Sequence, residues 1–445
     1  MATPISSNPF VVVFVGIVLF LIGRVIIRRI SESERDPWLA KVLTACLIIH
    51  LICAPLQIWV VDHLYQGIAD YNRYDTQGSL LAPGFRHLDF SLAPGHLPGI
   101  VADGSVSIVT GVVFAIVGVN QAAGFMVFSF LAFIGVVYFY RAFTVTFSGM
   151  GNRRYGYVLF FLPSLMFWTS DVSKEALMVF LLGLTAYGCA MILARRGGAK
   201  YWVLILACSV GGAFIRPNQM VLAVGGFAIA MIFRPVSATT RYEPGRRTFS
   251  LILLGGMVGV AIFVTLNFLP GLHGSLSLTT IAANNSAANN SGAGFGSTVA
   301  YSASPLYYWR DVYVVLLDPL PFNAHGGGEW LEAFENMVLV VFAAFSLRQL
   351  RILPRAAFAR PYVILCGFFV ASFCYAFAAL GNLGLITRES TVLSPFLLVL
   401  LCIPRGPRYR PPRYVWELRR RDRVARRRVQ ARHTRARPPG RVLQG

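Results

Sequence analysis

The feature that most constrains this chain is a series of long apolar segments that recurs from end to end. Eleven such runs lie at approximately 10–27, 38–62, 120–140, 155–169, 175–194, 201–215, 218–233, 248–268, 331–347, 361–381 and 389–403. About 20 apolar residues span the hydrocarbon core of a bilayer as a helix. Only 13% of the 445 residues are charged, whereas a soluble domain carries roughly 25%. We therefore predict an all-α, polytopic membrane helix bundle of about eleven transmembrane helices.

The basic residues between the runs predict how the chain is oriented. Arginine or lysine gathers in every connection that follows an odd-numbered run, for example at Arg29, Arg154 and Arg195. Such connections face the cytoplasm in membrane proteins. The alternation places the N-terminus outside and the C-terminus in the cytoplasm of a chain that crosses the cell membrane many times.

These runs divide the chain into a transmembrane domain, residues 1–403, and a tail, residues 404–445. Two outer loops are long, at about 62–120 and 269–330, and the first is expected to contain a partly apolar helix near 106–118. The tail holds fifteen arginines and two acids. We predict that it is disordered and binds anionic inner-leaflet lipids. Because it lacks a recognisable nucleic-acid-binding module, we expect no nucleic-acid partner.

Three of the few cations on the predicted outer side lie at helix ends, namely Lys174, Arg216 and Arg388. Lys174 opens a predicted helix, where the helix dipole disfavours a cation. An arginine between two short helices costs about 2.5–3.5 kcal/mol on insertion scales. An anionic ligand accounts for both positions, because these side chains suit phosphate oxygens. A snorkelling lysine, and an ion pair of Arg216 with Asp171 or Glu175, account for them equally well.

Carboxylates accompany these cations. Asp70 and Asp75 bound the segment DYNRYD, and Glu175 and Glu389 each follow a cation directly. An aspartate just outside a helix end can act as a general base or hold a metal, although the same pattern fits an acidic solvated loop. The seven cysteines form no CxxC pair, so we predict neither a disulfide framework nor a metal site from them. The polar residues together favour an enzyme or a carrier for a lipid-linked phosphate.

Several segments resemble those of GT-C membrane glycosyltransferases and of bacterial polysaccharide-polymerase-like membrane proteins. They are Asp70 with Tyr74, PSLMFWTSDVSKEAL at 163–177, IRP at 215–217, DPLPFNAH at 318–325 followed by Glu335, and NLGLITRES at 382–390. The resemblance covers most of residues 60–403, and the segment 163–177 is its most specific part. It implies a GT-C-like bundle.

The resemblance implies a glycosyltransferase that uses a polyprenyl-phosphate-linked sugar donor and a glycan acceptor at the extracytoplasmic face, in cell-surface glycan assembly. On this chain Asp70 becomes the candidate base, with Asp75 as the second choice. Lys174, Arg216 and Arg388, with the neighbouring Glu175 and Glu389, become the substrate-binding residues. No cofactor is required by the sequence, and a divalent cation is left open.

Two alternatives stay open from the sequence. One is a repeat-unit polymerase or ligase that uses pyrophosphate-linked oligosaccharides. The other is a lipid or solute transporter that performs no chemistry. The sequence predicts no gate in its short, basic cytoplasmic connections, which favours an enzyme over a transporter.

Overall fold

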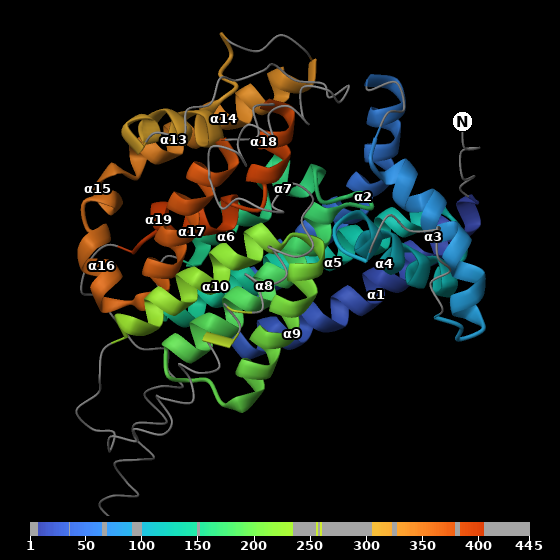
Figure 1. Cartoon of the computed structure of the whole chain (residues 1–445), viewed down its shortest axis with the longest axis horizontal. Helices are drawn as coiled ribbons and strands as arrows, with labels where there is room; N and C mark the ends of the chain where they lie inside the picture. The colour runs from blue at the N-terminus through green and yellow to red at the C-terminus, as the bar shows by residue number, and fades with distance from the viewer. Residues whose placement is uncertain are drawn as a thin grey trace, which may run out of the picture.

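The computed structural model describes residues 8–34, 36–64, 69–90, 100–148, 152–234, 255–256, 259, 305–322, 327–378 and 383–404. These residues are all-helical, as predicted, and their helices pack into one bundle (Figure 1). The helices are α1 (Pro9–Glu34), α2 (Pro37–Leu64), α3 (Tyr71–Arg86), α4 (Asp103–Val117), α5 (Gln121–Phe147), α6 (Asn152–Phe160), α7 (Pro163–Phe167), α8 (Lys174–Leu193), α9 (Ala199–Ile215), α10 (Pro217–Ile232), η1 (Pro305–Tyr307), α13 (Tyr308–Leu317), α14 (Gly327–Phe345), α15 (Leu347–Leu350), α16 (Leu353–Ala359), α17 (Pro361–Phe377), α18 (Leu383–Ser390) and α19 (Ser394–Leu401).

Among the described residues, four helices are long and apolar enough to cross a membrane: α1, α2, α5 and α8. The pair α18 and α19 makes a fifth span if the two are counted as one, with a bend of 61° between them. The helices α4, α9, α10 and α17 and the 333–345 part of α14 are apolar but shorter. The chain therefore has the helices of a membrane protein, while the predicted count of eleven is not confirmed.

Proline accounts for part of this difference, and almost all of the run 248–268 lies outside the described residues. The predicted run 155–169 is divided into α6 and α7, because Pro163 cannot continue a helix that approaches it from the N-terminal side. Pro217 begins α10 directly after α9 ends, so the predicted pair of short helices is present. Pro395 lies in the first turn of α19, where proline is tolerated. These prolines produce short helices whose ends lie inside the bundle.

The first long loop is more ordered than its sequence suggests. A helix near 106–118 was expected and is present as α4, but the DYNRYD segment, expected as a loop, opens the helix α3. Helices α3 and α4 pack against each other closely, since Gly78 of α3 lies against Gly111 and Thr110 of α4. This hairpin holds Asp70 and Asp75 at fixed positions beside the bundle.

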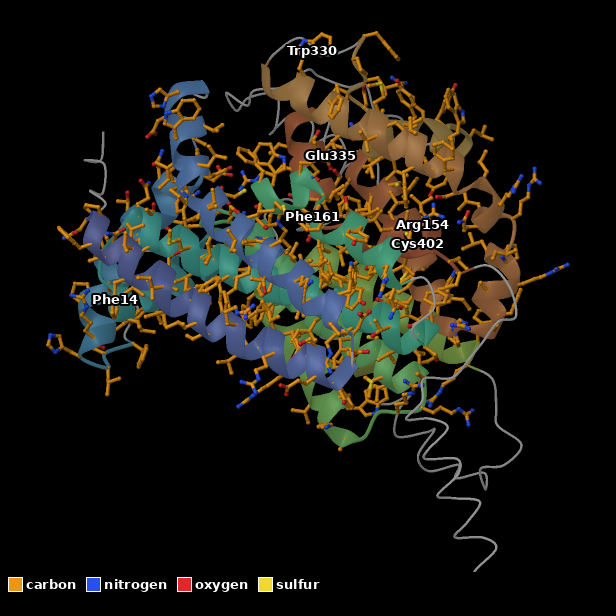
Figure 2. The ribbon with its side chains drawn as sticks, turned by 180° about the vertical axis from the view of Figure 1, so that it is seen from behind. Phe14, Arg154, Phe161, Trp330, Glu335 and Cys402 are labelled. Carbon is orange, nitrogen blue, oxygen red and sulfur yellow. The ribbon has the colours of Figure 1, made fainter. Side chains whose placement is uncertain are left out.

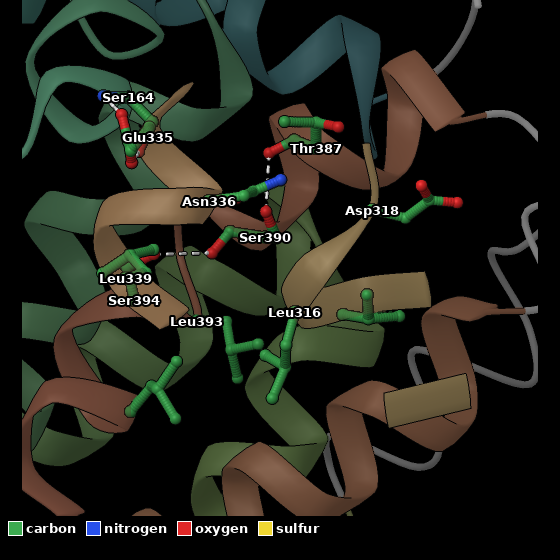
Figure 3. A pocket seen from close by; sticks show the side chains of 12 residues that line it. Ser164, Leu316, Asp318, Glu335, Asn336, Leu339, Thr387, Ser390, Leu393 and Ser394 are labelled. Carbon is green, nitrogen blue, oxygen red and sulfur yellow. Dashed lines mark hydrogen bonds between the residues drawn. The ribbon is translucent and has the colours of Figure 1, made fainter. Parts of the chain in front are cut away.

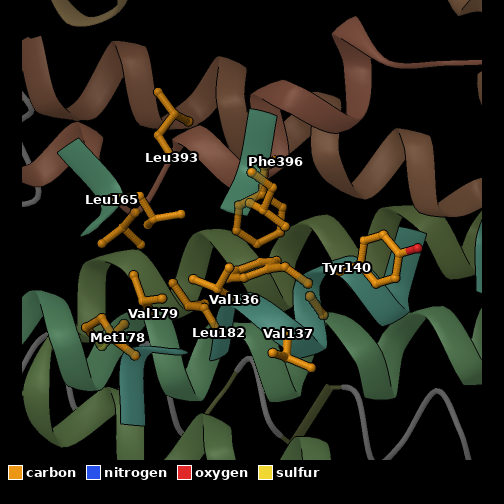
Figure 4. Packing of buried hydrophobic residues seen from close by; sticks show 14 of the residues in the cluster. Val136, Val137, Tyr140, Leu165, Met178, Val179, Leu182, Leu393 and Phe396 are labelled. Carbon is orange, nitrogen blue, oxygen red and sulfur yellow. The ribbon is translucent and has the colours of Figure 1, made fainter. Parts of the chain in front are cut away.

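The core of the bundle lies between α5 and α8. Val136 and Val137 of α5 meet Val179 and Leu182 of α8, and Phe396 of α19 packs against the same layer (Figure 4). The two helices approach so closely that a side chain at Gly135 or Gly183 would collide with the backbone of the other helix. Small residues permit this close approach in membrane bundles. The contact fixes the axis of α8, whose first turn carries Lys174 and Glu175.

Helix α1 shows the opposite pattern. Its buried residues, among them Val15, Leu19 and Ile27, follow a single stripe that faces α2 and α5, and only 22% of its most apolar stretch is buried. Large apolar side chains such as Phe10 and Phe14 are exposed on the other faces (Figure 2). A helix that is apolar all round but buried on one stripe suits contact with lipid.

Several predictions lie outside the described residues. They concern the basic tail beyond Pro404, most of the second long loop up to Ser304, and almost all of the predicted run 248–268. The orientation of the N-terminus and C-terminus across the membrane stays a prediction from the charge pattern.

Candidate functional site

The start of α8 places two opposite charges side by side. Ser173 caps the helix, since its hydroxyl accepts a hydrogen bond from the backbone N–H of Ala176 at 3.3 Å. Lys174 and Glu175 follow in the first turn. The Glu175 side chain is fully buried, and a carboxylate there is stabilised by the N-terminal end of the helix dipole. A buried carboxylate still needs charged or hydrogen-bonding partners, and two arginines supply them.

Arg388 on α18 binds Glu175 with two nitrogens. Its Nη2 donates to Glu175 Oε2 at 3.0 Å, and its Nε lies 2.8 Å from Oε1. Its remaining Nη1 donates to Asp70 Oδ2 at 2.7 Å, across 318 residues of sequence. The guanidinium fork is therefore shared by one buried and one exposed carboxylate, since Asp70 is 61% exposed.

Arg216 is the second partner of Glu175. It lies in the break between α9 and α10, where it follows the last turn of one helix and precedes Pro217 of the next. Its Nη2 donates to Glu175 Oε1 at 2.7 Å, and its Nη1 is in contact with Glu389 Oε2. Gln219 Nε2 donates to the same Glu389 oxygen at 2.6 Å. Of the two acids offered as ion-pair partners of Arg216 in the alternative without a ligand, Asp171 and Glu175, the structure shows Glu175.

A second group of charges centres on Asp103, the first residue of α4. Lys174 Nζ lies 2.6 Å from Asp103 Oδ1, and the Tyr74 hydroxyl donates to the same oxygen at 2.9 Å. Arg73 Nη1 donates to Oδ2 at 2.8 Å. Since Lys174 and Glu175 are neighbours in sequence, the two groups form one charge cluster. Its members are Asp70, Arg73, Asp103, Lys174, Glu175, Arg216, Arg388 and Glu389.

The charge cluster is electrically balanced, because its four cations face four carboxylates. Its members differ sharply in burial. Glu175 is fully buried, Arg216 and Arg388 are mostly buried, and Asp70 is the most exposed of the acids. Every charged side chain of the cluster therefore has a counter-charge within it. An anionic ligand on Arg388 would compete with Asp70 for the guanidinium Nη1 and would add one negative charge to the site.

Two further carboxyls, outside this cluster, have raised pKa values. Burial, with a smaller contribution from the charge of Asp171, raises the pKa of Asp75 to about 7, while a 3.1 Å hydrogen bond from Gln121 opposes the shift. Burial likewise raises the pKa of Asp171 to about 6, although Arg388 pulls it down. One oxygen of each carboxyl is buried without a hydrogen-bond partner among the described residues.

The structure therefore places the seven residues singled out from the sequence in two positions. Asp70, Lys174, Glu175, Arg216, Arg388 and Glu389 come together in the charge cluster. Asp75 lies apart, 2% exposed and turned toward Gln121. Asp75 is enclosed by the chain, so Asp70 is the more accessible of the two aspartates.

Sequence reasoning missed Asp103 as a member of the charge cluster. Asp103 precedes an apolar segment and reads as an ordinary acidic residue of a helix start. Its place in the charge cluster depends on tertiary contacts. The Ala102 backbone N–H and the Ser105 hydroxyl both donate to the Phe214 carbonyl, at 2.7 and 3.2 Å, and hold the start of α4 near the end of α9. No local signal in the sequence indicates that contact.

No group of three or more His, Cys, Asp or Glu side chains within the described ranges is placed to hold a metal ion. All seven cysteines are free thiols. Comparison with protein-family models, curated proteins and solved structures gave no match to this chain.

Proposed function

We propose that this chain is a membrane glycosyltransferase that takes a sugar from a polyprenyl-phosphate carrier at the extracytoplasmic face of the cell membrane and contributes to cell-surface glycan assembly. The observation that carries the proposal is the sharing of Arg388 between buried Glu175 and exposed Asp70. A phosphodiester that links a sugar to a lipid bears one negative charge, so it would compete with the Asp70 carboxylate for the Nη1 position of Arg388.

Displacement of the Asp70 carboxylate from Arg388 by the donor phosphodiester would have two consequences. The phosphodiester would take the Arg388 Nη1 position and lie near Arg216, with the lipid tail among the neighbouring apolar helices. Asp70 would be released beside the anomeric carbon, free to accept a proton from an acceptor hydroxyl. Glu175 would stay in place and hold both guanidinium groups toward the phosphate. Arginine donors fixed in this way need little reorganisation during the reaction.

In the proposed reaction, the acceptor oxygen forms a bond to the anomeric carbon, and its proton passes to the Asp70 carboxylate. The bond from the anomeric carbon to the phosphate oxygen breaks, and the phosphate leaves with the electron pair. The polyprenyl phosphate gains one negative charge in this step. Arg388 and Arg216 would stabilise that charge as it develops.

Purified protein in nanodiscs, supplied with radiolabelled polyprenyl-phosphate sugars from its host membranes, provides the direct test. We expect Arg388→Lys to reduce transfer by about 100-fold or more, because a lysine cannot bridge two anions with a planar fork. Arg86→Lys is the matched control. Arg86 donates to the carbonyls of Phe114 and Ala115, away from the charge cluster, so its replacement should keep near-normal transfer.

Glycan analysis of a deletion strain distinguishes the alternatives. Loss of polymer with retention of single repeat units would favour a polymerase that uses pyrophosphate-linked donors. A normal glycan in strains carrying Asp70→Asn or Arg388→Lys would overturn the proposed mechanism, provided that both variants accumulate in the membrane. Transport of labelled lipid across vesicles without sugar transfer would favour the carrier.

A further inference from the structure

Two cavities between the described helices differ greatly in size. The smaller has a volume of about 30 Å³ and lies between α7, α14 and the α18–α19 pair, where Glu335 accepts a hydrogen bond from the Ser164 backbone N–H at 2.6 Å (Figure 3). It has room for roughly two water-sized groups. The larger has a volume of about 200 Å³ and lies between the end of α5, α16, the start of α17 and the segment after α19. The larger cavity therefore has room for a whole chemical group.

The larger cavity is lined by apolar and basic side chains. Phe147, Ile352 and Ile403 are among its apolar residues, and Arg355 and Arg360 are its two arginines. Within the described part of the chain, no acid is among its lining residues. Such a lining suits a ligand that carries a negative charge beside an apolar portion, as an anionic phospholipid does.

Arg360 fixes one wall of the larger cavity. It is the N-cap residue of α17, and its Nη1 donates to the Thr146 backbone carbonyl of α5 at 2.6 Å. Its guanidinium also lies over the Phe147 ring, 4.8 Å from the ring centroid. These contacts join α5 to α17 beside the cavity, so we assign Arg360 a structural role there and do not count it among the ligand donors.

Arg355, on α16, is placed differently. It is exposed, and its side chain makes no hydrogen bond or ion pair within the described ranges. Its guanidinium has a planar fork of N–H donors, which matches two oxygens of one phosphate group. An anionic group in the larger cavity would supply the counter-charge that Arg355 lacks among these residues.

The larger cavity lies where several connections of the chain meet. Phe147 follows the third apolar run of the sequence, Ile352 follows the ninth, and Ile403 ends the eleventh. Beside them, the Phe233 ring at the end of the seventh run contacts the Phe358 ring of α16, with centroids 6.2 Å apart. The basic residues that follow these four runs predict a cytoplasmic position for each. Their meeting at one place in the bundle supports that shared side.

Residues on the predicted outer side meet elsewhere in the bundle. Asp70, Arg216 and Arg388 lie in connections that follow even-numbered runs, and all three belong to the charge cluster. Helix α5 joins the two places, because its first residue, Gln121, donates to Asp75 of α3 and its last lines the larger cavity. Its 27 residues extend over about 40 Å. A bilayer with its headgroups is about 40–45 Å thick, so the cavity lies at the depth of the opposite headgroups.

We propose that the larger cavity binds the phosphate headgroup of an anionic phospholipid in the cytoplasmic leaflet, with Arg355 donating to the phosphate oxygens. The rings of Phe233 and Phe358, 48% and 67% exposed, lie beside the cavity and would contact the acyl chains. The site is formed by the helices, so it is separate from the predicted lipid contact of the arginine-rich tail. It does not depend on the proposed glycosyl transfer.

Native mass spectrometry of the purified full chain in detergent measures this binding. The probes are phosphatidylglycerol, phosphatidylcholine with the same acyl chains, and inorganic phosphate. We expect phosphatidylglycerol to bind more tightly than phosphatidylcholine, whose headgroup has no net charge, and to resist displacement by inorganic phosphate, which has no acyl chain. Arg355→Gln should weaken phosphatidylglycerol about tenfold, as loss of a hydrogen bond to a charged group does, and leave phosphatidylcholine unchanged.

Arg351→Gln is the matched control for charge. Arg351 is exposed and lies in the same basic connection, but it does not line the larger cavity. Its replacement removes the same charge, and at physiological salt it should change the affinity less than about twofold, because exposed charges are screened. The tail is intact in both variants, so its own lipid binding cancels in the comparison.

A second pair of variants tests the larger cavity through its volume. Ala356 lines the cavity, whereas Ala359 of the same helix is exposed and does not. Ala356→Phe should fill the cavity and remove the preference for phosphatidylglycerol, and Ala359→Phe should keep it. This pair decides the question independently of Arg355.

The leaflet is tested by labelling Ala359→Cys with a membrane-impermeant maleimide. We expect labelling in inside-out vesicles and none in right-side-out vesicles. The wild-type chain, whose cysteines are buried or half-buried, gives the background.

Equal affinities for the two phospholipids would overturn the proposed lipid site. So would equal weakening by Arg355→Gln and Arg351→Gln, or a preference that survives Ala356→Phe. Displacement of phosphatidylglycerol by inorganic phosphate would assign the cavity to free phosphate instead, and labelling of Ala359→Cys in right-side-out vesicles would overturn the cytoplasmic position. None of these results bears on sugar transfer, so the proposed function is tested separately.

Discussion

Helix α8 takes part in two regions that are held together by opposite means. Its middle packs against α5 through apolar side chains and two glycines, with the backbones in close approach. Its first turn carries Lys174 and Glu175 into the charge cluster. The apolar contact depends on the close fit of the two helices, so an added side-chain atom at either glycine would collide with the other backbone. The charge cluster needs every partner present, since a buried charge that loses its counter-charge is costly.

The two regions differ in whether a ligand could take the place of a side chain. Nothing in the α5–α8 contact can be replaced by a ligand without opening the bundle. Within the charge cluster, Asp70 is exposed and Glu175 is fully buried, so we propose that Asp70 is the member that a ligand can displace from Arg388. The apolar contact between α5 and α8 holds the start of α8 in place for this site.

The largest effect is expected from Glu175→Gln. The substitution keeps the shape but removes the negative charge shared by Arg216 and Arg388, so we expect a loss of about 3–5 kcal/mol in the free energy of unfolding. Thermal unfolding in detergent measures it. Glu32→Gln is the control, because Glu32 pairs with Arg28 on an exposed face of α1 and its loss should not change the midpoint measurably. Equal midpoints for the two variants would contradict the buried role of Glu175.

A smaller loss is expected from Gly183→Ala on the apolar side. The added methyl group would meet the Gly135 backbone, which cannot rotate away, so we expect a loss of about 1–3 kcal/mol. Gly211→Ala is the matched control, since a methyl group there meets only Leu181 side-chain atoms at 3.7 Å. The prediction fails if both variants unfold at the same temperature.

Asp75→Asn should change how stability depends on pH. The pKa of Asp75 is about 7 in the folded chain, above its value of about 3.9 when unfolded. The folded state therefore holds more protons between these values, and stability falls as pH rises from about 4 to about 7. The variant should be more stable than the wild type at pH 8, by about 1–2 kcal/mol, and indistinguishable from it at pH 4. If the free energy of unfolding changed with pH in the same way for Asp75→Asn and the wild type, the prediction would be wrong.

The smallest effect on stability, and a large one on activity, is expected from Asp70→Asn. Asp70 is 61% exposed, so its ion pair contributes less than about 1 kcal/mol. If Asp70 is the base, sugar transfer should nevertheless fall by about 100-fold or more. The amount of folded protein in nanodiscs measures the effect on stability, and the rate of sugar transfer per folded protein measures the effect on activity. Normal transfer would remove Asp70 from the reaction and leave the charge cluster as a structural network.

The repeated apolar runs were enough to predict a helical chain that suits a membrane, because such runs satisfy their backbone hydrogen bonds in lipid as helices. The sequence also identified charged residues at positions where a charge without a partner is unfavourable. Lys174 at a helix start and Arg216 beside Pro217 are costly positions, and such positions need a partner whatever the fold.

The pairing of these residues depends on how the helices pack. Asp70 and Arg388 are 318 residues apart and meet because α3 and α18 pack near the start of α8. Asp103 joined the charge cluster, and Asp75 was buried away from it, through packing that has no local sequence signal. The division of run 155–169 into two helices was readable from Pro163, but the position of Ser164 against Glu335 was not. Apolar periodicity acts locally along the chain, whereas charge pairing depends on distances that only the packed bundle sets.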